Sequence, residues 1–136
     1  MTTKEKKQLL LGYKVYLLHE QRILEEIDEL RLSQMSAAAR IGDGLPRSHD
    51  PTDLSSYAAR LDDLVARLQR ATESCVNARI RIEIAIDSLA DYPKEQVLIR
   101  MRYIDDYSWL AISKAMGYTV RHVTRIHGSA LKHITI

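Results

Sequence analysis

Hydrophobic residues recur three or four positions apart over the first forty residues of the chain, which is the period of one face of an α-helix. From about residue 6 to residue 39 these positions are Leu9, Tyr13, Tyr16, Ile23, Ile27 and Leu30, with Leu10, Leu17 and Leu24 widening the stripe. Residues 40–53 (RIGDGLPRSHDPTD) break the pattern, because two glycines and two prolines stand among polar residues. We therefore expect one long amphipathic helix, a loop over about residues 40–52, and Asp50 as the cap of a helix that begins at Pro51.

A second long segment carries a more regular seam, in which apolar positions alternate steps of four and three. The seam comprises Tyr57, Leu61, Leu64, Leu68, Ala71, Cys75, Ala78, Ile82, Ala85 and Leu89. This heptad pattern is typical of coiled coils, and the first long helix can fold back to cover it, so we expect residues 1–90 to form a long antiparallel helical hairpin. Further apolar residues lie outside the seam and predict either a third helix or a second chain in a homodimer: Val65, Val76, Ile80, Ile84 and Ile86.

Three shorter helical patterns follow in the C-terminal third. Pro93 fits the first turn of a helix, whose expected buried face comprises Val97, Leu98, Met101 and Ile104. After a turn at residues 105–107, Ser108 can cap a second short helix, and Gly117 permits the positive φ of a sharp turn at its end. Thr119 can cap the last helix, expected from about residue 119 to 134. The whole chain is therefore predicted to be all-α.

The residue order from Trp109 onwards fits two helices that cross at a wide angle, as in a helix-turn-helix. The inward positions are Trp109, Ile112, Met116, Tyr118, Val123 and Ile126, and the closest crossing falls on the small Ser113. The outward positions of the last helix are Val120, Arg121, Thr124 and Arg125, near the end that enters the major groove of DNA in such motifs. Residues 92–136 carry seven Lys or Arg against three Asp or Glu, a balance of +4, whereas residues 1–91 carry 13 against 15. Double-stranded DNA is therefore the expected partner of residues 91–136.

The segment LADYPKEQVLIRMRYIDDYSWLAISKAMGYTVRHVTRIHGSALKHI resembles region 4 of primary-type sigma factors, which binds the −35 element. With the preceding helical pair, the chain resembles small phage-encoded late-gene transcriptional regulators of the ArpU/RinA type. The resemblance implies a DNA-binding regulator, with RNA polymerase as a further candidate partner. No segment resembles the one that melts the −10 element, so a complete sigma factor is not expected. The candidate DNA-binding residues are Ser108, Thr119, Val120, Arg121, His122, Thr124, Arg125, Ser129 and Lys132. By analogy with sigma factors, the base-reading positions are Val120, Arg121, Thr124 and Arg125, and those near phosphates are Ser108, His122, Ser129 and Lys132.

Other kinds of chemistry find little support in the sequence. No clustered nucleophile, base and orienting group indicates an enzyme, and no motif requires a cofactor. His122, His127 and His133 are spaced by five and six residues, which does not suit a metal pair on one helical face, so solvated or phosphate-adjacent histidines are expected. The lone Cys75 is expected to be a buried structural thiol. The apolar runs are short and interrupted by charges, which predicts a cytoplasmic protein that does not bind membranes.

The alternative is a helical protein–protein interaction or adaptor protein, of the anti-sigma or polymerase-binding type, without specific DNA binding. In that case the long hairpin docks on another helical protein, and Arg121 and Arg125 form an ordinary solvated face. A salt titration of duplex DNA binding separates the two hypotheses. A DNA-binding regulator loses affinity steeply as salt rises, whereas an adaptor binds DNA little at any salt concentration.

Overall fold

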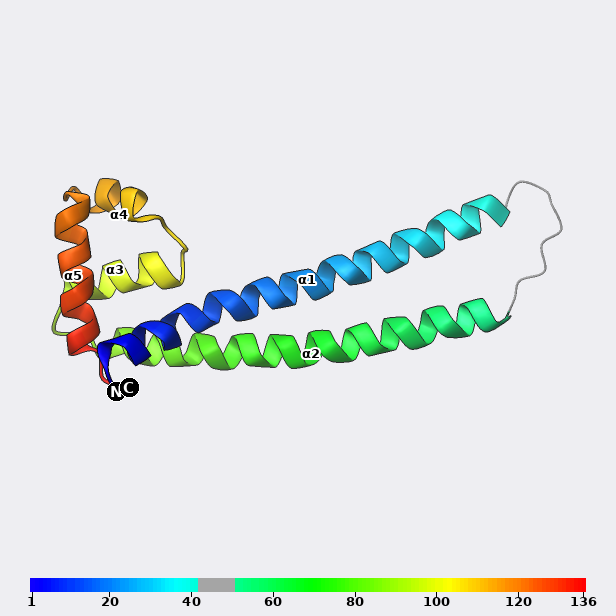
Figure 1. The fold of residues 1–136 in the computed structure, drawn as a ribbon, viewed down its shortest axis with the longest axis horizontal. Coiled ribbons are helices and arrows are strands. Elements are labelled where there is room, and N and C mark those ends of the chain that lie inside the picture. The colour runs from blue at the N-terminus through cyan, green and yellow to red at the C-terminus, as the bar shows by residue number, and fades with distance from the viewer. Residues whose placement is uncertain (42–50) are drawn as a thin grey trace. The chain divides into compact units, whose positions relative to one another are not determined.

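The computed structural model describes residues 1–41 and 51–136, and the side chains of residues 1–37 and 54–136. Within these ranges the chain forms helices and no strand (Figure 1). The helices are α1 (Thr3–Ile41), α2 (Pro51–Asp87), α3 (Pro93–Tyr103), α4 (Trp109–Met116) and α5 (Val120–His133). The prediction of an all-α chain is therefore confirmed, and α2 begins at the expected proline. The cap at Asp50 and most of the expected loop lie outside the described residues.

Packing divides the chain into two compact units, which we describe separately. Unit 1 comprises Met1–Tyr16 and Cys75–Ile136, and unit 2 comprises Leu17–Ser74. Both long helices therefore contribute to both units. The boundary predicted near residue 90 separates the helical hairpin from the DNA-binding domain, and it does not coincide with the boundaries of these packing units. As a division by function, it stays a prediction.

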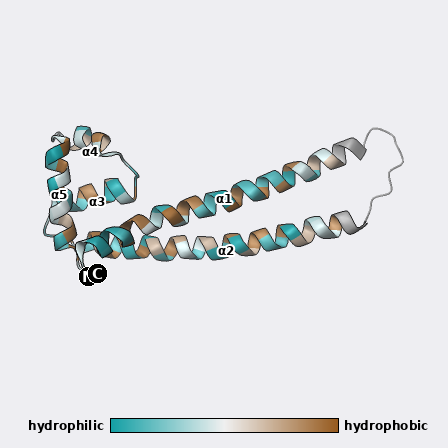
Figure 2. Ribbon diagram, in the orientation of Figure 1, coloured by the Kyte–Doolittle hydropathy of each residue, from teal (hydrophilic) through white to brown (hydrophobic). Residues whose placement is uncertain are grey.

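Unit 2 is held together by the apolar stripes of α1 and α2. Its core comprises Ile23, Ile27, Leu64 and Ala71, against which Leu30, Leu61 and Leu68 pack. All seven belong to the predicted stripes, and Figure 2 shows hydrophobic positions recurring along both long helices. The prediction for Leu24 is wrong, since its side chain is 42% exposed. A heptad spacing drifts by about 20° per repeat on a straight α-helix, so Leu10 is buried, Leu17 half-buried and Leu24 exposed.

Unit 1 combines the start of α1 and the end of α2 with the three short helices. Its core draws on all five helices, and its members with at most 1% exposure are Leu10, Ile82, Ala85, Ile86, Leu89, Leu98, Ile99, Ile112, Val123, Ala130 and Ile134. Burying an aliphatic side chain of this kind contributes about 1.5–3 kcal/mol, so this cluster is the main source of stability in unit 1. Cys75 is also buried, as expected. The prediction for Tyr16 is wrong, because this side chain at the edge of the α1 stripe is 44% exposed.

Polar contacts in unit 1 centre on the carboxylate of Glu83 in α2. Arg100 of α3 donates two hydrogen bonds to it, at 3.2 and 2.8 Å, and Arg79 donates a third at 3.0 Å. Hydrogen bonding by Arg100, followed by that of Arg79, lowers the pKa of Glu83. Arg79 also donates to Tyr13 Oη of α1 at 3.3 Å. One carboxylate thus links α2 directly to α3 and, through Arg79, to α1.

The buried face of α3 differs from the predicted one. Leu98 is fully buried as expected, but Val97 is 50% exposed and its place in the core is taken by Ile99. Met101 and Ile104, the other predicted positions, are half-buried. The prediction assumed one buried face, whereas α3 contacts α2 through hydrogen bonds and packs against α5 on another side. Contacts with two neighbouring helices, α2 and α5, therefore determine which residues of α3 are buried.

Candidate nucleic-acid interface

The connection between α4 and α5 follows from local sequence chemistry. Gly117 ends α4 with φ 72° and ψ 27°, in the left-handed region, and its N–H donates to the Ser113 carbonyl at 3.0 Å. Thr119 caps α5, because its Oγ1 accepts a hydrogen bond from the backbone N–H of His122 at 3.1 Å. Ser108 caps α4 in the same way, at 3.1 Å. The predicted roles of the glycine and of both caps are confirmed.

α5 has one buried side and one exposed side. The buried residues are Val123, His127, Ala130 and Leu131, while Ile126, predicted to point inward, is half-buried. Eight of the nine candidate DNA-binding residues belong to α5 or its cap, and the ninth, Ser108, caps α4. Those that are exposed are Ser108, Thr119, Val120, Arg121, His122, Thr124, Arg125 and Lys132, and Ser129 is half-buried.

Basic residues follow the exposed side of α5. Arg121, Arg125 and Lys132 are spaced by four and seven residues, which places them on one helical face. None of the three forms an ion pair with any side chain in the described ranges. Thr124 Oγ1 donates to the Arg121 carbonyl at 2.8 Å, so its hydroxyl hydrogen is used within the helix. The face therefore presents three cations that form no ion pair within the described ranges, which favours an anionic partner.

The prediction that the C-terminal histidines face solvent or phosphate is wrong for His127. This residue is 7% exposed, and its Nε2 lies 2.7 Å from Tyr103 Oη. The Trp109 ring packs edge-on against its imidazole, with 4.9 Å between centroids. Burial lowers the pKa of His127 to about 4 and raises that of Tyr103 to about 12, so both side chains are neutral at pH 7. Sequence spacing could not show this pair, because only tertiary packing brings α3 beside α5.

His133 also differs from a solvated histidine. It is half-buried, and its Nδ1 lies 2.8 Å from Oε2 of Glu95, a carboxylate that is 8% exposed. Its ring stacks on Tyr92, with 3.9 Å between centroids and 5° between planes. These contacts compensate the burial of a polar pair and fix the last turn of α5 to the first turn of α3. His122 is exposed, as expected.

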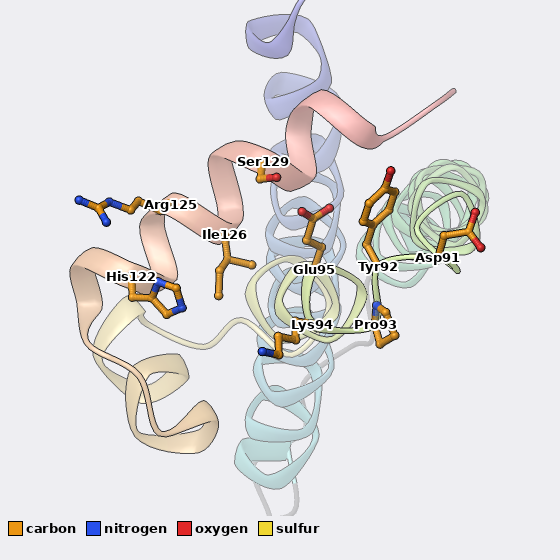
Figure 3. A pocket seen from close by; sticks show the side chains of 9 residues that line it. All are labelled: Asp91, Tyr92, Pro93, Lys94, Glu95, His122, Arg125, Ile126 and Ser129. Carbon is orange, nitrogen blue, oxygen red and sulfur yellow. The ribbon is translucent and has the colours of Figure 1, made fainter.

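A groove of about 600 Å³ lies between the first turn of α3 and the adjoining side of α5 (Figure 3). Its lining comprises Asp91, Tyr92, Pro93, Lys94, Glu95, His122, Arg125, Ile126 and Ser129. Three of these, all on α5, were candidate DNA-binding residues. The contribution of α3 was not predicted. Lys94 follows Pro93 in the sequence, and this local pattern does not indicate which helix will lie beside the lysine.

Two further features are absent from the described part of the chain. Its side chains contain no group of three or more His, Cys, Asp or Glu that could hold a metal ion. Nor does any helix in the described part of the chain combine the length and apolarity needed to cross a membrane. Comparison of the chain with protein-family models, with curated proteins and with solved structures found no match.

Proposed function

We propose that the chain is a sequence-specific DNA-binding regulator of transcription that reads the major groove with α5. The observation that carries this proposal is the basic face at the start of α5. Arg121 and Arg125 are exposed on its first two turns, and no acidic side chain in the described ranges pairs with them. In this proposal α4, the turn at Gly117 and α5 act as a helix-turn-helix with α5 as its recognition helix.

The resemblance to sigma region 4 supports the same proposal from the sequence. Residues 89–134 carry the resemblance, and they include all three short helices. By the same resemblance we propose that the regulator is encoded by a phage or prophage. RNA polymerase then becomes a candidate partner.

The exposed residues of the interface take different roles. Arg121 and Arg125 are assigned to base recognition, because a guanidinium can donate two hydrogen bonds to guanine O6 and N7. Lys132 lies about two turns beyond Arg125 and is assigned to a phosphate, where it contributes affinity without sequence information. The hydroxyls of Ser108 and Thr119 accept their capping hydrogen bonds and keep a hydrogen to donate to phosphate oxygens.

A homodimer belongs to the proposal, because two recognition helices in successive major grooves read more sequence than one. Val76, Ile80 and Ile84 form a row on α2 at i, i+4 and i+8, and each is 51–52% exposed. Ile86, another apolar residue outside the seam, is buried within unit 1 instead. The exposed row is suited to a second copy of the chain. It equally favours the second candidate function, an adaptor that binds another helical protein without specific DNA binding.

Selection from a random duplex pool separates these candidates. The full chain is incubated with the pool, bound duplexes are amplified over several rounds, and affinities for the enriched and the random duplex are measured across salt concentrations. A regulator should enrich a sequence and bind it at least about 10³-fold more tightly than random duplex. An adaptor should enrich none and bind little DNA at any salt concentration.

Substitutions on α5 test the assigned roles. Arg121→Ala or Arg125→Ala should cost about 1–3 kcal/mol on the enriched duplex and almost nothing extra on random duplex. Lys132→Ala should weaken both alike and lower the salt slope by about one unit. Arg60→Ala, at an exposed position of α2 in unit 2, is the matched control and should change neither affinity. Equal losses on both duplexes for the two α5 arginines would refute their role in base recognition.

A further inference from the structure

The groove beside α5 has a cationic end built from two helices and a turn. Lys94 Nζ, from the first turn of α3, lies 5.4 Å from the centroid of the Tyr118 ring. That ring in turn packs edge-on against His122, with 4.6 Å between centroids. Hydrogen bonding to Tyr118 raises the pKa of Lys94, so the ammonium is charged at neutral pH. Figure 3 shows the Lys94 and Glu95 side chains leaving α3 in opposite directions.

Neither acidic residue of the lining forms an ion pair with Lys94. Glu95 is engaged by His133 at 2.8 Å, and Figure 3 shows Asp91 directed away from Lys94. Across the described ranges, neither Lys94 nor Arg125 forms an ion pair. The groove therefore offers the Lys94 ammonium, with the His122 ring and the Ser129 hydroxyl in the same lining. A cation with hydrogen-bond donors beside it fits an anionic oxygen group.

The position of the groove indicates which anion. An α-helix with its side chains is about 10–12 Å across, and the major groove of DNA is about 12 Å wide. A recognition helix in that groove therefore has a phosphate strand close to each of its two sides. Lys94 lines the groove on the α3 side of α5, whereas Ser108 caps α4 and Thr119 caps α5.

We propose that the groove between α3 and α5 receives a backbone phosphate of the DNA strand that flanks α5, with Lys94 as the principal phosphate contact of α3. This inference rests on the proposed function and extends the interface to a helix outside the α4–α5 pair. Arg125, at the boundary between the groove and the outward face, remains assigned to a base. His122 and Ser129 add hydrogen-bond donors along the α5 wall of the groove.

Lys94→Ala in the full chain tests the inference, with Lys4→Ala as the control. Both lysines are exposed, both belong to unit 1, and each substitution removes one positive charge, but Lys4 is not part of the groove. Lys94→Ala should weaken binding to enriched and random duplex by the same factor. With one fewer phosphate contact the salt slope should fall by about 0.9, so the affinity ratio of wild type to variant should shrink about 3.5-fold between 50 and 200 mM salt. Lys94→Arg should restore the slope, and circular dichroism should show unchanged helicity in all variants.

A position-specific measurement completes the test. Neutral methylphosphonate linkages are placed one at a time along the enriched duplex. At one flanking position the neutral linkage should weaken binding of the wild type and of Lys4→Ala, but should have no further effect on Lys94→Ala. The absence of any such position, or a salt slope of Lys94→Ala equal to that of Lys4→Ala, would overturn the groove inference while the wild type still binds DNA. A wild type that shows no salt-dependent duplex binding would overturn the proposed function and the groove inference together.

Discussion

Acid should weaken unit 1 through the buried His127, and the size of the effect follows from its surroundings. Burial lowers the pKa of His127 to about 4, with smaller contributions from the charges of Lys7 and Arg102. In the unfolded chain the imidazole titrates near its ordinary pKa of about 6.5. Below pH 6.5 the unfolded state therefore binds a proton that the folded state does not bind. The stability supplied by the neutral imidazole is complete above pH 6.5 and is lost as the pH falls toward 4.

Each pH unit in this window removes about 1.4 kcal/mol from the free energy of unfolding, so the loss should reach about 3 kcal/mol at pH 4. That is a large fraction of the 5–15 kcal/mol typical of a folded domain. Urea unfolding followed by circular dichroism at half-unit steps from pH 7 to 4 measures this loss. His127→Gln is the comparison, because glutamine can still hydrogen-bond Tyr103 Oη but does not titrate. The other histidines and the carboxylates are common to both proteins, so the difference between the two pH profiles isolates His127. Parallel profiles for wild type and variant would refute the reasoning.

The other predictions concern backbone conformation and the exposed row of α2. Gly117→Ala should cost about 1–2 kcal/mol of stability, because it forces a Cβ into the left-handed region; thermal unfolding measures the loss, and an unchanged transition would contradict the strain. Gly128→Ala should instead stabilise the protein by up to about 1 kcal/mol, because a Cβ there meets no atom within 4 Å. Gly12→Ala, in equally open surroundings on α1, should give a similar gain in stability in the same assay. A loss of stability in either variant would show that the added Cβ does not fit at that position. Ile80→Glu should convert a dimer to monomers in sedimentation experiments, whereas a wild type that sediments as a monomer at micromolar concentration would remove the dimer from the proposal.

The ends of the helices were predictable because local chemistry determines them. Pro93 can occupy a first turn, Ser108 and Thr119 can accept a hydrogen bond from a backbone N–H two or three residues on, and glycine adopts a positive φ at little cost. Each of these preferences acts over a few residues and is visible in the printed sequence. The structure places all of them where the sequence predicted.

The errors arose where a side chain's surroundings depend on distant residues. Val97 lies next to the buried Leu98 and has similar hydrophobicity, and only the positions of α2 and α5 decide that it remains exposed. In the sequence, His127 cannot be distinguished from the neighbouring histidines. Its buried partner Tyr103 lies 24 residues earlier, and only the fold brings the two side chains together. The role proposed for Lys94 depends equally on packing, because α3 meets α5 only in the folded unit. Such facts are properties of the tertiary structure, and no local pattern encodes them.

Unit 1 is discontinuous in the sequence, and this has a consequence for synthesis on the ribosome. Leu10 belongs to the same unit as Ile134, and the ribosome synthesises all of unit 2 between these two residues. At 5–20 residues per second, the interval between the synthesis of Tyr16 and that of Ile134 is about 6–24 s. The α2 residues of unit 1, from Cys75 onward, are translated about midway through this interval, and the last core residues only at its end. The start of α1 therefore cannot complete its core contacts until Ile134 has been synthesised.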